Sequence, residues 1–278
     1  MKKVLAILLA ATMLFAFAAC GGNKTNTDAN TNTDAATTSD LDYVKANGKL
    51  VIGYTEFAPM NYYDADGNFI GFETDFAKAI CEELGVEAEF QLIKWSAKET
   101  ELASKNIDCI WNGMTITPER EEAMSISTPY MANKQVLVVR AEDAEKYTTA
   151  EAMKDVAVVA EQESAGEEVI TTDAFFAEAK YTPVVDMATA LKEVKAMTAD
   201  ACVVDYVTSI GMIGEGTDYA DLVVVDAMSF ADEQYGIAFR KDSDITAAVN
   251  AAITKLVENG KLAEIAAEYK LSEQIIAK

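Results

Sequence analysis

The feature that most constrains the fold is a regular alternation of two kinds of segment after residue 48. Short apolar runs, typical of buried β-strands, are interleaved with amphipathic segments that have helical spacing. The apolar runs are residues 49–54, 88–93, 108–114, 135–140, 156–161, 180–185, 200–206, 221–226 and 235–240. This alternation predicts an α/β fold whose sheets carry helices on both faces.

A candidate anion site follows the apolar run 108–114, since ligands of α/β sheets bind where strands end. Thr117 can cap a helix, Pro118 suits its first position, and Arg120 then lies in the first turn. Free backbone N–H groups and a guanidinium at one point suit an anion. On this motif alone, the alternative that Arg120 lies on the outer face of a helix stays open.

A similar site follows the run 156–161. Ser164 and Glu167 have the S-x-x-E spacing of a capping box, and Gly166 would let a ligand approach the backbone. Asp205, near the end of another run, is a candidate partner for a cation, although a single acid is usually a surface residue. If the two halves face one another, these groups meet the needs of a zwitterionic α-amino acid.

Composition excludes several classes of function. The chain has no histidine, which removes Ser-His-Asp and Cys-His nucleophiles and histidine zinc sites. The loop 64–68 begins like a calcium loop but has Phe69 where the sharp-turn glycine is needed, so it predicts a hairpin. We therefore expect no catalytic residue, no cofactor and no metal. The formal net charge of -23 argues against nucleic acid as a partner.

The remaining cysteines give a weaker signal. Cys81, Cys109 and Cys202 form neither a disulfide framework nor a zinc pattern, so we expect buried, small apolar residues. A bridge between Cys81 and Cys109 stays open as an alternative.

The N-terminus has the pattern of a targeting segment. A basic start and the apolar run 4–17 lead to small residues before Cys20, which resembles a bacterial lipoprotein signal spanning 1–20. In that interpretation Cys20 is lipidated. The alternative is secretory cleavage after Ala19, which would leave a free thiol at Cys20.

Residues 21–40 are rich in Thr, Asn and Asp and predict a flexible tether. We expect a lipid-anchored protein on the outer face of the bacterial cytoplasmic membrane.

Six segments, in order and spacing, resemble the family 3 extracellular solute-binding proteins, the amino-acid receptors of ABC importers. They are GYTEFAPM (53–60), DADGNFIGFETDFAKAICEELG (64–85), KNIDCIWNGMTITPERE (105–121), STPYM (127–131), DACVVDY (200–206) and EQYGIAFRKDSD (233–244). The resemblance implies a two-lobed periplasmic-binding-protein-like fold of type II, with two crossover strands near 136–140 and 228–236 and closure by a hinge. Lobe 1 would comprise 41–139 and 232–278, and lobe 2 would comprise 140–231.

The resemblance also implies how the ligand backbone is bound. Arg120 would pair bidentately with the α-carboxylate. Ser164 and Ala165 would donate backbone N–H groups to the same carboxylate from the second lobe. Asp205 and the carbonyl of Gly113 would bind the α-ammonium.

Three further residues would line the pocket. The resemblance implies that Thr115 offers its hydroxyl and amide to the ligand. Phe57 and Trp95 would form the aromatic walls of the side-chain pocket, with plain core packing as the alternative for both.

Departures from the family pattern bear on specificity. Ala165 replaces a common hydroxyl residue, so only its amide can serve. The segment before Phe57 is one residue shorter than usual, so Glu56 either meets a cationic ligand side chain or faces solvent. Trp111 and Asn112 stand where smaller residues are common, and Asn112 could bond a polar ligand side chain.

We therefore expect a lipid-anchored receptor, not an enzyme, that binds a free amino acid between its lobes and delivers it to an ABC importer permease. The protein would be a monomer that meets the membrane only through its lipid. One alternative is an enzyme on the same fold, similar to cyclohexadienyl dehydratase, with Glu56, Glu99 or Asp205 as its acid. Others are a ligand-sensing module and a purely structural surface protein. The sequence does not identify the amino acid.

Overall fold

The computed structural model describes residues 39–278, apart from the side chains of Asp226 and Ala227. The predicted signal segment 1–20, with its Cys20, and residues 21–38 of the predicted tether lie outside the described residues. Helix α1 (Asp40–Asn47) begins at the last residue of that tether.

The first lobe contains a mixed five-stranded sheet of order β4-β1-β5-β12-β6. β1 is parallel to β4 and β5, and β12 is antiparallel to β5 and β6. The strands are β1 (Lys49–Tyr54), β4 (Glu87–Leu92), β5 (Cys109–Ile110), β6 (Met124–Ile126) and β12 (Ala238–Arg240). A separate hairpin of β2 (Tyr62–Tyr63) and β3 (Phe69–Ile70) confirms the turn predicted at 64–68.

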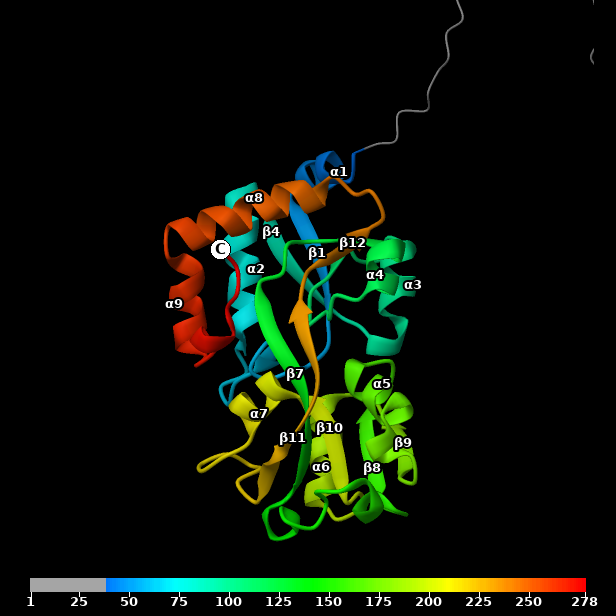
Figure 1. The fold of residues 1–278 in the computed structure, drawn as a ribbon. Coiled ribbons are helices and arrows are strands. Elements are labelled where there is room, and N and C mark those ends of the chain that lie inside the picture. Colours follow the sequence, from blue (N-terminus) through cyan, green and yellow to red (C-terminus); the bar gives the residue numbers. More distant parts are fainter. Residues whose placement is uncertain (1–38) are drawn as a thin grey trace, which may run out of the picture. The chain divides into compact units, whose positions relative to one another are not determined.

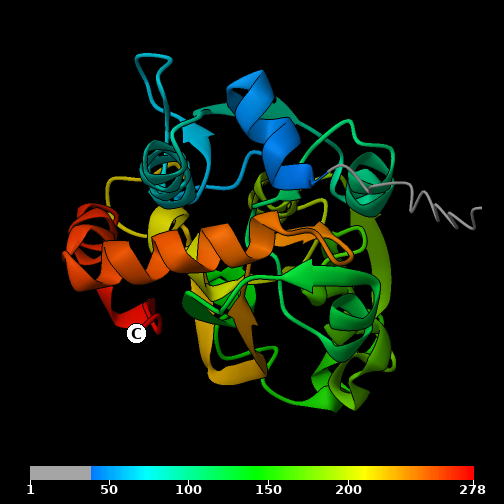
Figure 2. The same ribbon diagram turned by 90° about the horizontal axis from the view of Figure 1, so that it is seen from above.

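Helices cover both faces of this sheet. Successive strand residues point to opposite faces, so Cys109 packs with α2 and α8 whereas Ile110 packs with α3. The helices are α2 (Phe72–Leu84), α3 (Lys98–Ala103), α4 (Pro118–Ala123), α8 (Ile245–Glu258) and α9 (Lys261–Glu268). Viewed from above, the orange helix α8 runs beside blue α1 and red α9 and contacts both (Figure 2).

The second lobe contains a sheet of order β11-β7-β10-β8-β9. Its strands are β7 (Met131–Arg140), β8 (Ala157–Glu161), β9 (Lys180–Val184), β10 (Ala201–Asp205) and β11 (Leu222–Tyr235). β8 is parallel to β9 and β10, and β7 is antiparallel to β10 and β11. α5 (Ala165–Thr172) packs on one face through Val169, and α6 (Met187–Lys195) packs on the other through Leu191.

The remaining elements are short. α7 (Tyr206–Met212) follows β10 directly. The 3-10 turns are η1 (Trp95–Ala97), η2 (Ala141–Asp143), η3 (Ala150–Met153), η4 (Ala174–Phe176) and η5 (Ser272–Gln274). No helix among residues 39–278 is long and apolar enough to cross a bilayer.

Two long strands, β7 and β11, run from one lobe into the other (Figure 1). They pair from Arg140 opposite Leu222 to Met131 opposite Tyr235, with register shifts between Val224 and Asp232. The crossover predicted near 136–140 falls within β7, and the one predicted near 228–236 falls within β11 except for its last residue. The predicted lobe limits also fall there and stay a prediction.

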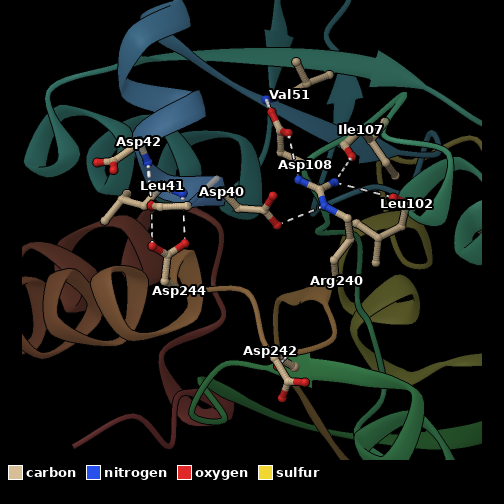
Figure 3. A network of polar contacts seen from close by, with 12 residues as sticks. Asp40, Leu41, Asp42, Val51, Leu102, Ile107, Asp108, Arg240, Asp242 and Asp244 are labelled. Atoms are coloured by element: carbon tan, nitrogen blue, oxygen red, sulfur yellow. Dashed lines mark hydrogen bonds and ion pairs between the residues drawn. The ribbon is translucent and has the colours of Figure 1, made fainter. Parts of the chain in front are cut away.

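Arg240, at the end of β12, ties distant parts of the first lobe together (Figure 3). Its Nε donates to Asp40 Oδ2 at 3.0 Å and its Nη2 to Asp108 Oδ1 at 3.3 Å. Its Nη1 donates to the carbonyls of Ile107 at 2.8 Å and Leu102 at 3.4 Å. The guanidinium is therefore surrounded by acceptors from α1, α3 and the loop before β5.

The start of α1 is held at the same end of the lobe. Ser39 caps the helix by accepting from the N–H of Asp42 at 2.9 Å. Asp244, which precedes α8, accepts from the N–H of Leu41 at 2.9 Å and from the Ser39 hydroxyl. The first described residues are thus joined to the start of α8.

Helix α2 begins at Phe72, directly after Gly71, and the Thr74 hydroxyl in its first turn donates to the Ile70 carbonyl at 3.2 Å. The positive φ of Gly71 (133°), which a glycine adopts readily, permits the helix to begin at this point. The three later cysteines are buried and unpaired, so no bridge joins Cys81 to Cys109.

Candidate ligand-binding cavity

A cavity lies where the two lobes meet. It is lined by six residues of the first lobe and five of the second: Phe57, Trp95, Asn112, Gly113, Thr115, Arg120, Glu161, Ser164, Ala165, Met187 and Asp205. All nine residues predicted to bind ligand lie in this set. Their roles as ligand contacts stay a prediction.

The topology explains why these residues meet. Glu161 and Asp205 are the last residues of the parallel strands β8 and β10, and Asn112 and Gly113 follow β5. The carboxyl ends of strands from both sheets therefore open into the same cavity, which is the usual place for a ligand in α/β sheets.

Arg120 supplies the positive charge of the cavity. Thr117 caps α4 by accepting from the N–H of Arg120 at 3.3 Å, and Pro118 is the first helical residue, as predicted. The Arg120 Nη1 donates to the Thr115 carbonyl at 2.8 Å. Within residues 39–278 this is the one hydrogen bond of the guanidinium, and no ion pair engages it. Burial lowers the pKa of Arg120, while Glu233 and other acids act against this, so arginine stays charged.

Asp205, at the end of β10, belongs to a buried polar cluster with residues of β7 and β11. Asn133 on β7 donates to Asp205 Oδ1 at 2.9 Å, and Gln135 donates to Asp205 and, at 2.7 Å, to Glu233 Oε1 on β11. Thr115 Oγ1 donates to Glu233 Oε2 at 2.9 Å, so the cluster also contacts the first lobe. Burial, and then the neighbouring Glu233, raise the pKa of Asp205 well above its usual range. A cation arriving here would favour the carboxylate.

Ser164 caps α5 as predicted, but its amide is engaged. Its Oγ accepts from the N–H of Glu167 at 3.2 Å, and its own N–H donates to the Glu161 carbonyl at 3.2 Å. The reciprocal capping contact is shifted, because Glu167 accepts from the N–H of Glu163 at 2.5 Å. The amide of Ala165, the first helical residue, has no acceptor within the helix.

Gly166 has a packing role rather than the predicted ligand-approach role. A Cβ at this position would lie 2.9 Å from the carbonyl of Val203 on β10. The missing side chain therefore lets α5 lie close against the sheet.

The aromatic residues line the first-lobe side of the cavity. Phe57 and Trp95 are both buried, and the ammonium of Lys98 lies 4.8 Å from the Trp95 ring centroid. Gly113 has a φ of 60°, and a Cβ there would lie 2.6 Å from Phe57 Cε1. The Gly113 N–H donates to Glu73 Oε1 at 2.9 Å, and burial raises the pKa of Glu73 to about 7.

The residues suggested for specificity do not all line the cavity. Asn112 lines the cavity, but its amide bonds to Thr55 (Oγ1 at 2.6 Å and the carbonyl at 2.9 Å) and to Asn61 Oδ1 at 2.9 Å. Trp111 is fully buried in the core and does not line the cavity. Glu56 is exposed to solvent and does not line it either.

Sequence reasoning missed two lining residues, Glu161 and Met187. Glu161 ends its strand just as Asp205 does, which is a signal that could have identified it. Burial raises the pKa of Glu161 to about 8; Asp186 adds to the effect and Lys98 opposes it. Met187 begins α6 and carries no comparable signal.

The cavity brings together ionisable side chains of both signs. Among the described residues, no group of three or more His, Cys, Asp or Glu side chains could hold a metal ion. Of the three acids considered for an enzyme, Asp205 lines the cavity, whereas Glu56 and Glu99 are exposed. One cation and two buried carboxyl groups, contributed by facing lobes, can bind a ligand that carries both signs of charge.

Comparisons with known proteins point the same way. Residues 50–272 match the family model described as bacterial extracellular solute-binding proteins, family 3. The arginine-binding extracellular protein ArtP of Bacillus subtilis (strain 168) is 28% identical over 99% of this chain and 100% of its own length. The ABC transporter glutamine-binding protein GlnH of the same organism is 30% identical over 95% of this chain and 96% of its own.

The fold of this chain is also similar to that of a solved structure. The ancestral amino acid-binding protein AncCDT-1, a precursor of cyclohexadienyl dehydratase, has a TM-score of 0.75 and 31% identity. The match covers 83% of this chain and 99% of that one.

Proposed function

We propose that this chain, which belongs to family 3 of the bacterial extracellular solute-binding proteins, binds a free α-amino acid in the cavity between its lobes. The family membership confirms the resemblance predicted from the sequence, and the solved neighbours confirm the two-lobed α/β fold. The named relatives are binding proteins, so the chain is a binding protein and not an enzyme.

The observation that carries the proposal is the pairing of opposite charges across the cavity. Arg120 has guanidinium donors without acceptors among the described residues, and an α-carboxylate fits this fork bidentately. Asp205 is a buried carboxyl whose pKa is raised, and an α-ammonium would stabilise its ionised form. A free amino acid supplies both groups one carbon apart.

Further contacts would come from both lobes. The amide of Ala165 would donate to the α-carboxylate, with that of Ser164 if its bond to the Glu161 carbonyl opens. The carbonyl of Gly113 would accept from the α-ammonium, and Thr115 would add its hydroxyl and amide. A ligand that contacts both lobes stabilises their closed arrangement.

The proposal extends to transport. A lipid on Cys20 would hold the protein at the outer face of the cytoplasmic membrane, and the closed form would deliver its ligand to the permease of an ABC importer. The sequence before residue 21 and the similarity to GlnH, an ABC transporter glutamine-binding protein, support this role. The receptor would act as a monomer.

Thermal melts of the full chain against a panel of amino acids test the proposal. The protein is first unfolded, dialysed and refolded so that it carries no ligand. A ligand at about 1,000 times its Kd adds roughly 4 kcal/mol, which should raise the Tm by about 10 °C. We expect this rise with one or a few amino acids.

Two controls make the test specific. The α-carboxamide of the same amino acid should give no shift, because it lacks the charge that Arg120 binds. The Arg120→Met variant should fold but lose the shift. If no amino acid changes the Tm of the stripped protein, the proposed function is wrong.

A further inference from the structure

One buried ionisable group of the cavity has no part in binding the ligand backbone. Glu161 ends β8, is 4% exposed, and lines the cavity. Its Oε1 has no hydrogen-bond partner within the described residues. An unpaired polar atom in a buried site is costly, so its presence indicates that a ligand group satisfies it.

Nearby cations do not satisfy Glu161. Lys98, on α3 of the facing lobe, is buried and lies close enough to lower the pKa of Glu161. Its Nζ is instead directed to Glu163, 3.4 Å from the carbonyl and 3.8 Å from Oε2, and to the face of Trp95. No ion pair joins Lys98 to Glu161 in the part of the chain that the structure describes.

We propose that Glu161 binds a positively charged ligand side chain, so that the cavity selects α-amino acids with a cationic side chain. The inference rests on the proposed function, in which Arg120 and Asp205 bind the α-carboxylate and the α-ammonium. Glu161 and Met187 are then the lining residues left on the second lobe for the side chain, facing the aromatic walls of Phe57 and Trp95.

The charges of the cavity explain the selectivity. A cationic side chain gives the Glu161 carboxylate an opposite partner inside the cavity. A neutral side chain of the same shape leaves Glu161 unpaired or protonated. An acidic side chain places a second carboxylate beside Glu161 and is repelled.

L-arginine and L-citrulline are the probes, because they share a shape and differ in the charge of the terminal group. Isothermal titration of the stripped full chain should show that L-arginine binds roughly tenfold or more tightly than L-citrulline, as expected for a hydrogen bond to a charged group. Glu161→Gln should bring the ratio near one, mainly by weakening L-arginine. Glu163→Gln is the matched control, since this neighbouring carboxylate is half exposed and should leave the ratio unchanged.

The outcomes separate the two proposals. If the wild-type chain binds no amino acid, the proposed function fails and the role of Glu161 fails with it. If the chain binds L-citrulline or other neutral amino acids as tightly as L-arginine, the function stands and the role of Glu161 is wrong. A ratio that Glu161→Gln leaves intact also overturns that role.

A pH series on the wild-type chain tests the same role without any variant. The groups around Glu161 are Asp186 before α6, Lys98 on α3, and the cavity residues Arg120 and Asp205. Because the pKa of Glu161 is about 8, its carboxyl group is mostly protonated at lower pH. It must lose this proton before it can pair with a cation. Affinity for L-arginine should therefore rise on the order of tenfold between pH 6.5 and 8, relative to L-citrulline. Titration of Asp205 acts on both ligands alike and cancels in the ratio, so a flat ratio contradicts the proposal.

Discussion

Arg120 and Arg240 are two of the three arginines in the chain, and they occupy opposite kinds of site in the same lobe. Both are partly buried, and both donate to backbone carbonyls. Arg240 also has the carboxylates of Asp40 and Asp108 at 3.0 and 3.3 Å, whereas no described carboxylate forms an ion pair with Arg120.

The role of a buried arginine can be inferred from its acceptors, even in a structure without a ligand. A guanidinium has five donors in a fixed fork, and burying it is tolerated when acceptors meet them. Arg240 has its acceptors within the fold, so its role is structural. Arg120 has one such acceptor among the described residues, the Thr115 carbonyl, so its other guanidinium donors are available to a ligand.

The third arginine supports this distinction. Arg140, at the end of β7, pairs with Asp143 at 2.7 Å and Asp200 at 3.6 Å. It also donates to the carbonyl of Ala199 at 3.0 Å. Arg140 therefore belongs with Arg240, and Arg120 is the exception.

The largest expected effect is on stability, from Arg240→Met. The substitution leaves the buried Asp108 carboxylate and two carbonyls without their cation, which typically costs about 4 kcal/mol. The free energy of unfolding from urea titration should fall by that amount. Ligand affinity, measured at a temperature where the variant is folded, should stay within about threefold of the wild type because Arg240 does not line the cavity. A loss below about 1 kcal/mol would contradict the structural role.

Arg120→Lys should have a smaller effect, and on binding rather than on stability. Lysine keeps the charge but loses the planar fork, so the affinity for the amino acid should fall about 30-fold, equivalent to about 2 kcal/mol. The free energy of unfolding of the empty protein should change by less than about 1 kcal/mol, since only the bond to the Thr115 carbonyl is altered. The comparison between the arginines breaks down if this variant loses stability while its affinity is unchanged.

The place of the cavity arginine could be predicted from the sequence better than that of the structural one. Arg120 follows a strand and lies within a capped first turn, which are local signals, and the same reasoning identified Asp205 at a strand end. The partners of Arg240 lie 200 and 132 residues away along the chain. No local pattern specifies such contacts, because they depend on how α1 and β5 pack in the finished lobe.

Other features of the site also depend on contacts that are distant along the chain. Asn112 was expected to bond a polar ligand side chain, which stays a prediction, and its amide is also engaged by Thr55 and Asn61 from a neighbouring loop. Gly166 was given a ligand role, whereas the strand behind it explains its lack of a side chain. Glu161 was overlooked although its strand-end position could have been recognised.

The smallest effects should come from the helix caps beside the two arginines. Ser39 caps α1, which carries the Asp40 partner of Arg240, and Thr117 caps α4, which carries Arg120. Ser39→Ala and Thr117→Ala should each lower the free energy of unfolding by about 1 kcal/mol, because each leaves a backbone N–H without its acceptor. Only Thr117→Ala should also weaken ligand binding, by about threefold, since its cap holds the amide of Arg120 itself and loosening that turn misplaces the fork. Urea titration and calorimetric binding of both variants measure the two quantities separately. An equal loss of affinity in Ser39→Ala would mean that the structural and binding ends of the lobe are coupled, and the distinction between the two arginines would then be one of degree.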